Sequence, residues 1–120
     1  YFVIWGDDKE KILANKIRTL APNTIVFKKL SLGELISLVK QIDLVIGPDT
    51  GPTHIAWALN IPSITIFGPT PGYRNTCITS INKIIESDSI VDPNKIDKND
   101  DSIKSINLRD IVKISNKLLN

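Results

Sequence analysis

The sequence contains no methionine, one cysteine and one histidine among its 120 residues. The single cysteine, Cys77, excludes an internal disulfide, which fits a reducing compartment. One histidine and the lack of an Asp-x-Asp pair argue against a metal centre and against a Ser-His-Asp or Cys-His nucleophile. No apolar run approaches the roughly 20 residues of a membrane span. Because no initiator methionine is present and the chain opens inside an apolar run, residues 1–5, we expect a fragment of a longer protein.

Charge is almost balanced along the chain, with a formal net charge of +2. Residues 1–60 carry 7 basic and 6 acidic side chains, and residues 61–120 carry 8 and 7. Without a basic patch or stripe there is no electrostatic case for a nucleic-acid partner. The length fits one small domain, residues 1–120.

Short apolar runs alternate with stretches of helical periodicity. Such alternation predicts a Rossmann-like layered α/β fold with a parallel sheet, whose first strand is buried on both faces. Residues 78–91 are ambiguous and include a possible short strand at 84–85, and residues 92–105 read as an exposed loop. The predicted strands are 1–5, 24–27, 43–46 and 63–67. One predicted helix spans 52–60, and the others follow Asp7 or Asp8, Ser31 and Asn107. Ligands of such folds bind at the loops after the strands, here 6–11, 28–31, 47–53 and 68–74.

The segment from Asp49 to His54 carries the strongest local signal of a ligand site. A strand that turns through a glycine into a helix presents unpaired N–H groups and a positive dipole to an anion. We expect the backbone of Thr50, Gly51 and Thr53 and the two threonine hydroxyls to hold a phosphate. Asp49 would point to sugar hydroxyls and His54 to the phosphate or sugar. The alternative is a helix cap beside a half-buried histidine, and spacing alone leaves both open.

The other three loops carry weaker signals. Residues 68–74 form either a second wall of the pocket, with Thr70 and Arg74 facing an anion, or a rigid exit loop. Glu10 can take both hydroxyls of a ribose, or belong to an acid-rich helix start. Leu30 offers an apolar contact for a base, or is an ordinary core leucine.

Taken together, these loops resemble glycosyltransferase family nine, the bacterial ADP-heptose:lipopolysaccharide heptosyltransferases. The shared motif is Asp-Thr-Gly-x-x-His at 49–54, followed by a strand and Gly-Pro-Thr at 68–70. Trp5, Gly6, Glu10 and residues 30–32 sit at positions similar to those of the family. The resemblance covers nearly the whole chain, strongest over 43–74 and weak after residue 80.

The resemblance implies a GT-B fold, in which two Rossmann-like domains enclose the active site. This chain would be most of the C-terminal, donor-binding domain, without its first strand and helix and without the N-terminal acceptor domain. Thr50 and Gly51 would hold the diphosphate, with Thr53 and Thr70 beside it. Asp49 and His54 would reach the heptose or phosphate, Glu10 would bind the ribose, and Leu30 would line the adenine pocket.

The implied reaction is inverting transfer of heptose from ADP-heptose to the lipid A–Kdo acceptor, with no cofactor and no obligatory metal. Fixed backbone dipoles can stabilise the charge that grows on the departing ADP. The family's catalytic base is an aspartate of the N-terminal domain, so no catalytic residue is expected here, and Asp49 and His54 only support the reaction. Alone, the chain would bind ADP weakly and transfer nothing. A cytoplasmic enzyme with peripheral contact to the inner membrane is implied.

Two other functions stay open at this point. A non-catalytic receiver-like or nucleotide-sensing module would need an acidic cluster after the first strand, an aspartate ending a central strand and a lysine ending a later one. Asp7 and Asp8 fit the first requirement, but Asp49 lies in a Gly-Pro turn and no lysine follows Phe67. The second alternative keeps the GT-B fold with a UDP-sugar as donor.

Overall fold

The computed structural model describes residues 1–67, 78–86 and 107–120. Within these residues the chain divides into two compact units, Tyr1–Ser37 and Leu38–Asn120, each described here by itself. The predictions for Thr70 and Arg74 and for the loop 92–105 lie outside the described residues. Whether residues 1–120 form one donor-binding domain stays a prediction.

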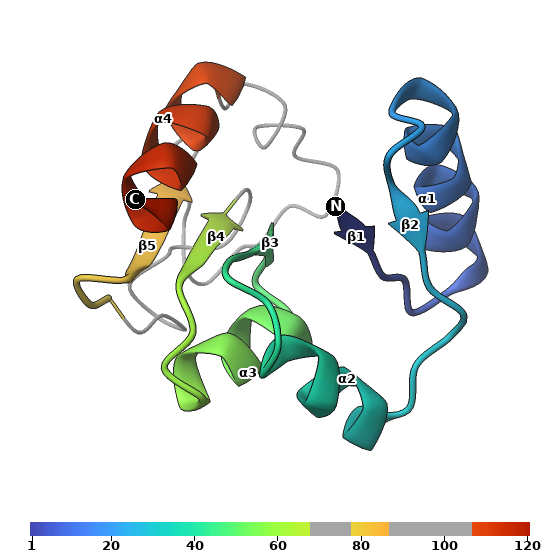
Figure 1. Cartoon of the computed structure of the whole chain (residues 1–120), viewed down its shortest axis with the longest axis horizontal. Coiled ribbons are helices and arrows are strands. Elements are labelled where there is room, and N and C mark those ends of the chain that lie inside the picture. The colour runs from blue at the N-terminus through green and yellow to red at the C-terminus, as the bar shows by residue number, and fades with distance from the viewer. Residues whose placement is uncertain (68–77, 87–106) are drawn as a thin grey trace, which may run out of the picture. The chain divides into compact units, whose positions relative to one another are not determined.

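The first unit joins a two-stranded parallel sheet to one helix. The strands β1 (Phe2–Val3) and β2 (Ile25–Val26) pair in parallel, with Phe2 opposite Ile25. The helix α1 (Asp8–Leu20) connects them and lies beside β2 in Figure 1. The carboxylate of Asp7 accepts a hydrogen bond of 2.9 Å from the N–H of Glu10, which caps α1 as the sequence predicts.

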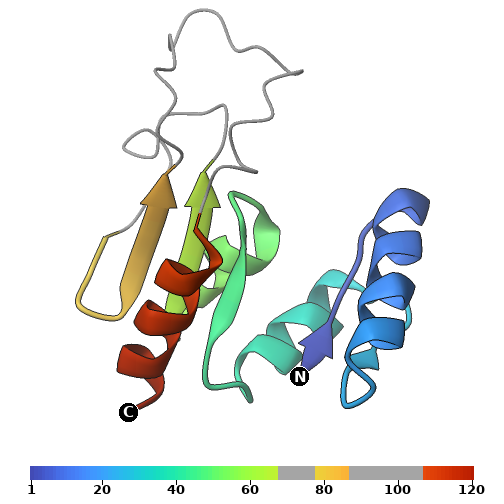
Figure 2. The same ribbon diagram turned by 90° about the horizontal axis from the view of Figure 1, so that it is seen from above.

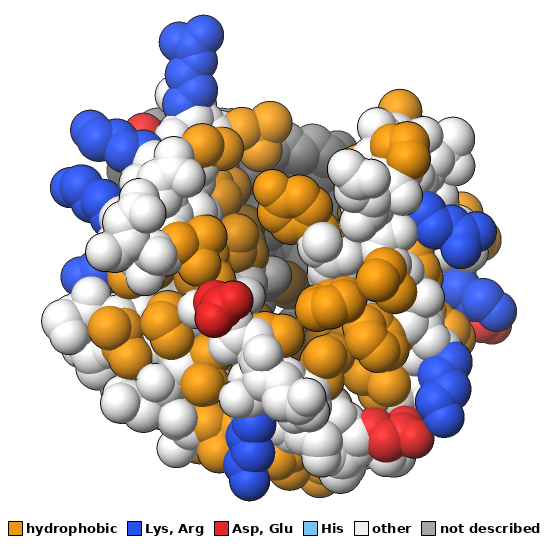
Figure 3. Space-filling model, viewed as in Figure 1, with side chains coloured by type: hydrophobic (Ala, Val, Ile, Leu, Met, Phe, Trp, Pro, Cys, Tyr) orange, Lys and Arg blue, Asp and Glu red, His pale blue; other side chains and the backbone are white. Residues whose placement is uncertain are grey.

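Burial of the first strand on both faces is a wrong prediction. The side chains of Tyr1 and Phe2 are 94% and 52% exposed. The reason is that β1 pairs with one strand, over two residues, in the described part of the chain. On α1, only Ala14 is fully buried, while Ile12 and Leu20 are exposed. Figure 3 shows hydrophobic side chains of this kind on the surface, beside projecting lysines and arginines.

The helix α2 (Leu32–Val39) crosses the division between the units and begins with the predicted capping box. The N–H of Glu34 donates to the Ser31 hydroxyl at 3.2 Å, and the N–H of Ser31 donates to the Glu34 carboxylate at 2.9 Å. Two N–H groups without helical partners are thereby satisfied, which explains why the helix starts at this point.

The second unit is built on a three-stranded parallel sheet of order β3-β4-β5. Its elements are β3 (Val45–Pro48), α3 (Gly51–Ala58), β4 (Ser63–Phe67), β5 (Asn82–Glu86) and α4 (Leu108–Leu119). The arrows of β4 and β5 point the same way in Figure 2, and α3 and α4 lie on opposite faces of the sheet. Ala56 of α3 and Ile64 and Phe67 of β4 are buried and form the core of this unit.

The strand β3 begins two residues later than predicted and extends through Gly47 and Pro48. Proline has no N–H for a ladder, so it is tolerated here because β3 is an edge strand of the described sheet. The ambiguous segment forms β5, and α4 starts after Asn107, whose side chain accepts from the N–H of Arg109 at 2.9 Å. None of the helices in the described ranges has the length and apolar character needed to cross a bilayer.

Candidate functional site

The turn between β3 and α3 forms the corner that the sequence singles out. Thr50 is the N-cap residue with an extended backbone, and Gly51 and Pro52 open the helix. Proline suits a first turn because the N–H that it lacks has no helical acceptor there. The corner lies at the carboxyl end of β3, where ligands of parallel α/β folds bind, and a Thr50–Thr53 capping box opens α3 there. This is the geometry of an anion site at a helix N-terminus.

The Thr53 side chain holds this turn together. It is fully buried, and its hydroxyl contacts the carbonyl oxygens of Thr50 at 2.8 Å and Pro48 at 3.0 Å. The same oxygen lies 3.3 Å from the backbone nitrogen of Thr50, which donates to it. The hydroxyl expected at a phosphate is thus committed to the turn, and the backbone N–H of Thr53 donates to the Thr50 side chain in a capping box, so the structure does not support the prediction that Thr53 binds the phosphate directly. The Thr50 side chain is exposed, and besides accepting from the Thr53 N–H its hydroxyl lies 3.5 Å from the Pro48 carbonyl oxygen.

Asp49 and His54 are brought into direct contact at the mouth of the corner. The Nε2 atom of His54 lies 2.6 Å from Oδ1 of Asp49, and their side chains are 49% and 19% exposed. An ionised carboxylate only accepts hydrogen bonds, so the hydrogen lies on Nε2. Asp49 therefore turns toward the histidine, and the second ring nitrogen, Nδ1, is the one left to meet a ligand.

Trp57 is a residue of this corner that the sequence reasoning missed. Its indole stacks on the His54 imidazole with ring centroids 4.5 Å apart and an angle of 21° between the planes. The signal was present in the spacing, because residues three apart on a helix share a face. The sequence does not show the hydrogen bond that orients His54, however, and without it a tryptophan at this spacing is interpreted as an ordinary core residue.

Gly51 leaves room for a ligand close to the backbone. In the part of the chain that the structure describes, a Cβ atom built on it would have no heavy atom within 4 Å beyond its chain neighbours and its own helix backbone, and its φ angle is not positive. The fold therefore does not require glycine at this position. A ligand that approaches the backbone closely would supply the reason for one.

Glu10 and Leu30 belong to the first unit. The Glu10 carboxylate folds back to the carboxyl end of β1, where Oε2 accepts from the N–H of Gly6 at 2.6 Å. One carboxylate oxygen is held in this way. Leu30 follows β2 and is half-buried. Nothing in this geometry assigns either residue to a ribose or a base, so both roles stay predictions.

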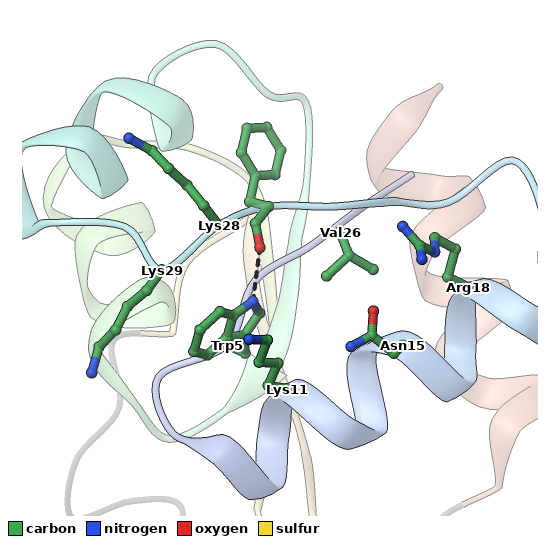
Figure 4. Close-up of a pocket in the computed structure, with 8 residues that line it drawn as sticks. Trp5, Lys11, Asn15, Arg18, Val26, Lys28 and Lys29 are labelled. Carbon is green, nitrogen blue, oxygen red and sulfur yellow. Dashed lines mark hydrogen bonds between the residues drawn. The ribbon is translucent and has the colours of Figure 1, made fainter.

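A groove of about 410 Å³ lies between α1 and β2 in the same unit. Figure 4 shows its lining: Lys11, Asn15 and Arg18 come from α1, Val26 comes from β2, and the Trp5 indole closes one end. The Trp5 N–H donates to the Phe27 carbonyl at 2.7 Å, and the Lys11 ammonium lies 5.1 Å from the indole centre. Neither Glu10 nor Leu30 lines the groove, which is thus separate from the predicted ribose and base contacts.

Metal ligands do not gather in the part of the chain that the structure describes. In residues 1–67, 78–86 and 107–120, no three His, Cys, Asp or Glu side chains lie together in a way that would hold an ion. The corner at α3 offers backbone N–H groups, an Asp–His pair and a stacked indole. Such a set can bind an anion and contact sugar hydroxyls.

Comparison with known sequences gives this corner a context. The family model described as "Glycosyltransferase family 9 (heptosyltransferase)" matches residues 2–102. Lipopolysaccharide heptosyltransferase 1 of Campylobacter coli is 46% identical over 98% of this chain and 36% of its own length. The protein of the same name from Pseudomonas aeruginosa is 33% identical over 58% of this chain and 20% of its own length. The chain thus spans about a third or less of the relatives that it matches.

Two solved structures with the same fold are complexes of one enzyme. E. coli heptosyltransferase WaaC with ADP superposes with a TM-score of 0.65 at 20% identity, over 98% of this chain and 34% of that one. The complex of WaaC with ADP-2-deoxy-2-fluoro heptose gives 0.66 at 19% identity, over 95% and 32%. The predicted α/β class with parallel sheets is confirmed, as a part of a GT-B heptosyltransferase fold.

Proposed function

Since the chain belongs to glycosyltransferase family 9, the heptosyltransferases of lipopolysaccharide synthesis, we propose that it is the donor-binding part of an enzyme that uses ADP-heptose. The observation that carries the proposal is the corner at α3, where a helix N-terminus stands beside the Asp49–His54 pair. The two WaaC structures of the same fold are complexes with ADP and with ADP-2-deoxy-2-fluoro heptose, which supports an ADP-sugar donor. We infer a heptosyltransferase of type I, after the relative with 46% identity.

The proposed donor contacts follow the family resemblance residue by residue. The N–H groups at the start of α3, with Thr50 and Gly51, would bind the diphosphate, because charge-assisted bonds from fixed donors favour an anion. Glu10 would accept from the ribose hydroxyls and Leu30 would contact the adenine. Asp49 and His54 would face the sugar side of the diphosphate. This arrangement needs no obligatory metal, since the helix dipole supplies the positive field.

The reaction would be a direct displacement with inversion. An acceptor hydroxyl loses its proton to a base, its oxygen forms a bond to the anomeric carbon of heptose, and the bond from that carbon to the diphosphate oxygen breaks with its electrons. Backbone N–H groups at α3 would stabilise the charge that develops on ADP. The base would be an aspartate of an N-terminal domain, in line with the family resemblance.

The acceptor and the location follow from the same proposal. The lipid A–Kdo inner core would be the acceptor, reached through the N-terminal domain. The enzyme would work in the cytoplasm, with peripheral contact at the inner face of the inner membrane where such a lipid is held.

The test uses the full-length protein that contains this chain. Incubation with ADP-heptose and lipid A–Kdo should release ADP and give a heptosylated lipid, detected by chromatography and mass spectrometry. Calorimetry with ADP, UDP and GDP should show a preference for ADP. A preference for UDP would indicate that the donor is a UDP-sugar. Tight nucleotide binding without any transfer would favour the nucleotide-sensing module. Residues 1–120 alone should show no turnover.

A further inference from the structure

The imidazole of His54 is constrained on one edge and on one face. Its Nε2 edge is held by Oδ1 of Asp49 at 2.6 Å. One of its faces lies against the Trp57 indole, with the centroids 4.5 Å apart and the planes 21° from parallel. Asp49 precedes His54 in the chain and lies in the loop before α3, whereas Trp57 follows it on the next turn of the helix. Together they leave the opposite face and the Nδ1 edge of the ring to the surroundings.

The hydrogen bond alone does not define the plane of the ring. Small changes of the two side-chain torsions can still tilt the ring while Nε2 stays within hydrogen-bond distance of Oδ1, and such tilting changes the direction of Nδ1. The stacked indole removes this freedom, because offset aromatic contact is favourable over a narrow range of orientation. A carboxylate therefore selects which nitrogen carries the hydrogen, and an indole selects the direction in which the other nitrogen points.

A purely structural role for Trp57 explains the contact less well. The Nε1 atom of Trp57 is buried and has no hydrogen-bond partner in the described part of the chain, so the polar edge of the indole is a cost rather than a gain. A phenylalanine or leucine side chain would fill space at this turn without the cost of burying an unpaired N–H. The indole face, by contrast, makes a defined contact, and it makes it with a half-exposed histidine at the mouth of the corner.

We propose that Trp57 is a positioning residue: it holds the His54 ring so that Nδ1 faces the donor at the point where the sugar joins the diphosphate. The inference rests on the proposed function for the identity of the donor. The stack itself does not depend on it. His54 touches the donor in this arrangement, and Trp57 acts only through His54.

The structural half of the proposal is tested by NMR of the full-length protein labelled with ¹⁵N and ¹³C at histidine. The resonances of His54 are assigned by their loss in His54→Gln. They should show the upfield shift of protons that lie over an indole, lose it in Trp57→Leu, and retain much of it in Trp57→Phe. Trp5→Phe is the matched control, because Trp5 lies in the first unit and donates to Phe27, and it should leave the His54 signals in place. Unchanged His54 signals in Trp57→Leu overturn the proposal.

The functional half uses kinetics on the same variants. Trp57→Leu should lower kcat about tenfold while the ADP dissociation constant changes less than about twofold, since misaligned groups slow the chemistry more than they weaken binding. Trp57→Phe should restore most of the rate, which a loss of folding would not allow. Equal loss of rate and of ADP affinity in both variants contradicts the positioning role. The wild type could show no heptose transfer while its His54 signals still change in Trp57→Leu. In that case the proposed function fails and the contact between the two rings is upheld.

Discussion

Asp49 and His54 are joined by a 2.6 Å contact between Oδ1 and Nε2, across the turn that links β3 to α3. The carboxylate is therefore engaged with the imidazole at the very place where the helix N-terminus offers donors to an anion. An aspartate beside a phosphate would normally oppose binding through like charge. Its contact with the histidine orients the Asp49 carboxylate toward the imidazole, in keeping with the proposal that the diphosphate binds to the backbone of this corner.

The first prediction concerns this pair. Asp49→Ala should lower the rate of transfer about tenfold, because His54 loses the group that selects the hydrogen on Nε2. The affinity for ADP should stay the same or rise, since a negative charge near the diphosphate is removed. Asp49→Asn, which retains an acceptor oxygen, should keep more of the rate. Steady-state kinetics and calorimetry on the full-length enzyme measure both effects. A tenfold loss of ADP affinity in Asp49→Ala would show instead that Asp49 binds the nucleotide.

Much of the fold was predictable because local signals agree with the packing. The Ser31–Glu34 capping box, the Asn107 cap and the strand 63–67 all appear where the sequence predicts them. In each case the interaction that defines the element lies within a few residues. The strand-turn-helix corner was predictable for the same reason, since Gly51 and Pro52 are local signals of a helix start.

The features that were missed depend on contacts that no local pattern encodes. The buried Thr53 hydroxyl looks like a ligand group in the sequence, and only the path of the turn directs it to the carbonyl of Pro48. The stack of Trp57 depends on the orientation of the His54 ring, which Asp49 determines. The exposure of β1 depends on which strands pair with it. Each is a matter of three-dimensional partners rather than of residue type.

A second prediction separates recognition of the ribose from recognition of the base. Glu10→Gln keeps an acceptor oxygen for the N–H of Gly6, so the loop should be retained. The loss of the negative charge should weaken ADP and UDP binding by a similar factor, about tenfold, because both nucleotides share the ribose. Calorimetry with the two nucleotides measures this. If only ADP is affected, Glu10 contacts the adenine side and the ribose assignment is incorrect.

A third prediction concerns pH and the capping box of α2. The pKa of the Glu34 carboxyl lies below its usual value of 4.5. The main cause is the hydrogen bond from the N–H of Ser31, and the second is the ammonium of Lys28 at 3.2 Å. A lowered pKa in the folded state means that the carboxylate stabilises α2 above pH 4.5 and that this contribution is lost as the pH falls through the lowered pKa. Lys28→Ala should move the pKa only part of the way back, since the Ser31 bond remains. NMR titration of the Glu34 carboxyl carbon checks this, and a wild-type value at or above 4.5 would contradict it.

A fourth prediction tests the polar contacts inside the β4–β5 pair. The Asn82 side chain is 1% exposed, and its Nδ2 donates to the Ser63 hydroxyl and to the Ile61 carbonyl, each at 2.9 Å. Asn82→Ala leaves these groups without that donor and should cost about 1–3 kcal/mol. Hydrogen exchange of the β4 and β5 amides in the full-length protein reports the loss locally. The control is Asn116→Ala on the exposed surface of α4, which should change protection little. Equal effects of the two changes would rule out a special role for the buried amide.

The last prediction uses two glycines that differ in position but not in local space. Among residues 1–67, 78–86 and 107–120, a Cβ atom at Gly51 or at Gly33 would meet no heavy atom within 4 Å beyond the chain neighbours and the helix's own backbone, and both residues lie in helices. Alanine at either position should therefore leave the fold intact or stabilise it by about 0.5–1 kcal/mol. Gly51→Ala should nevertheless weaken ADP binding, and Gly51→Val should abolish it, because the added atoms stand where the diphosphate approaches the backbone. Gly33→Ala should bind ADP as the wild type does. Thermal unfolding and calorimetry on the full-length protein separate the two effects, and wild-type ADP affinity in Gly51→Val would remove the phosphate from this corner.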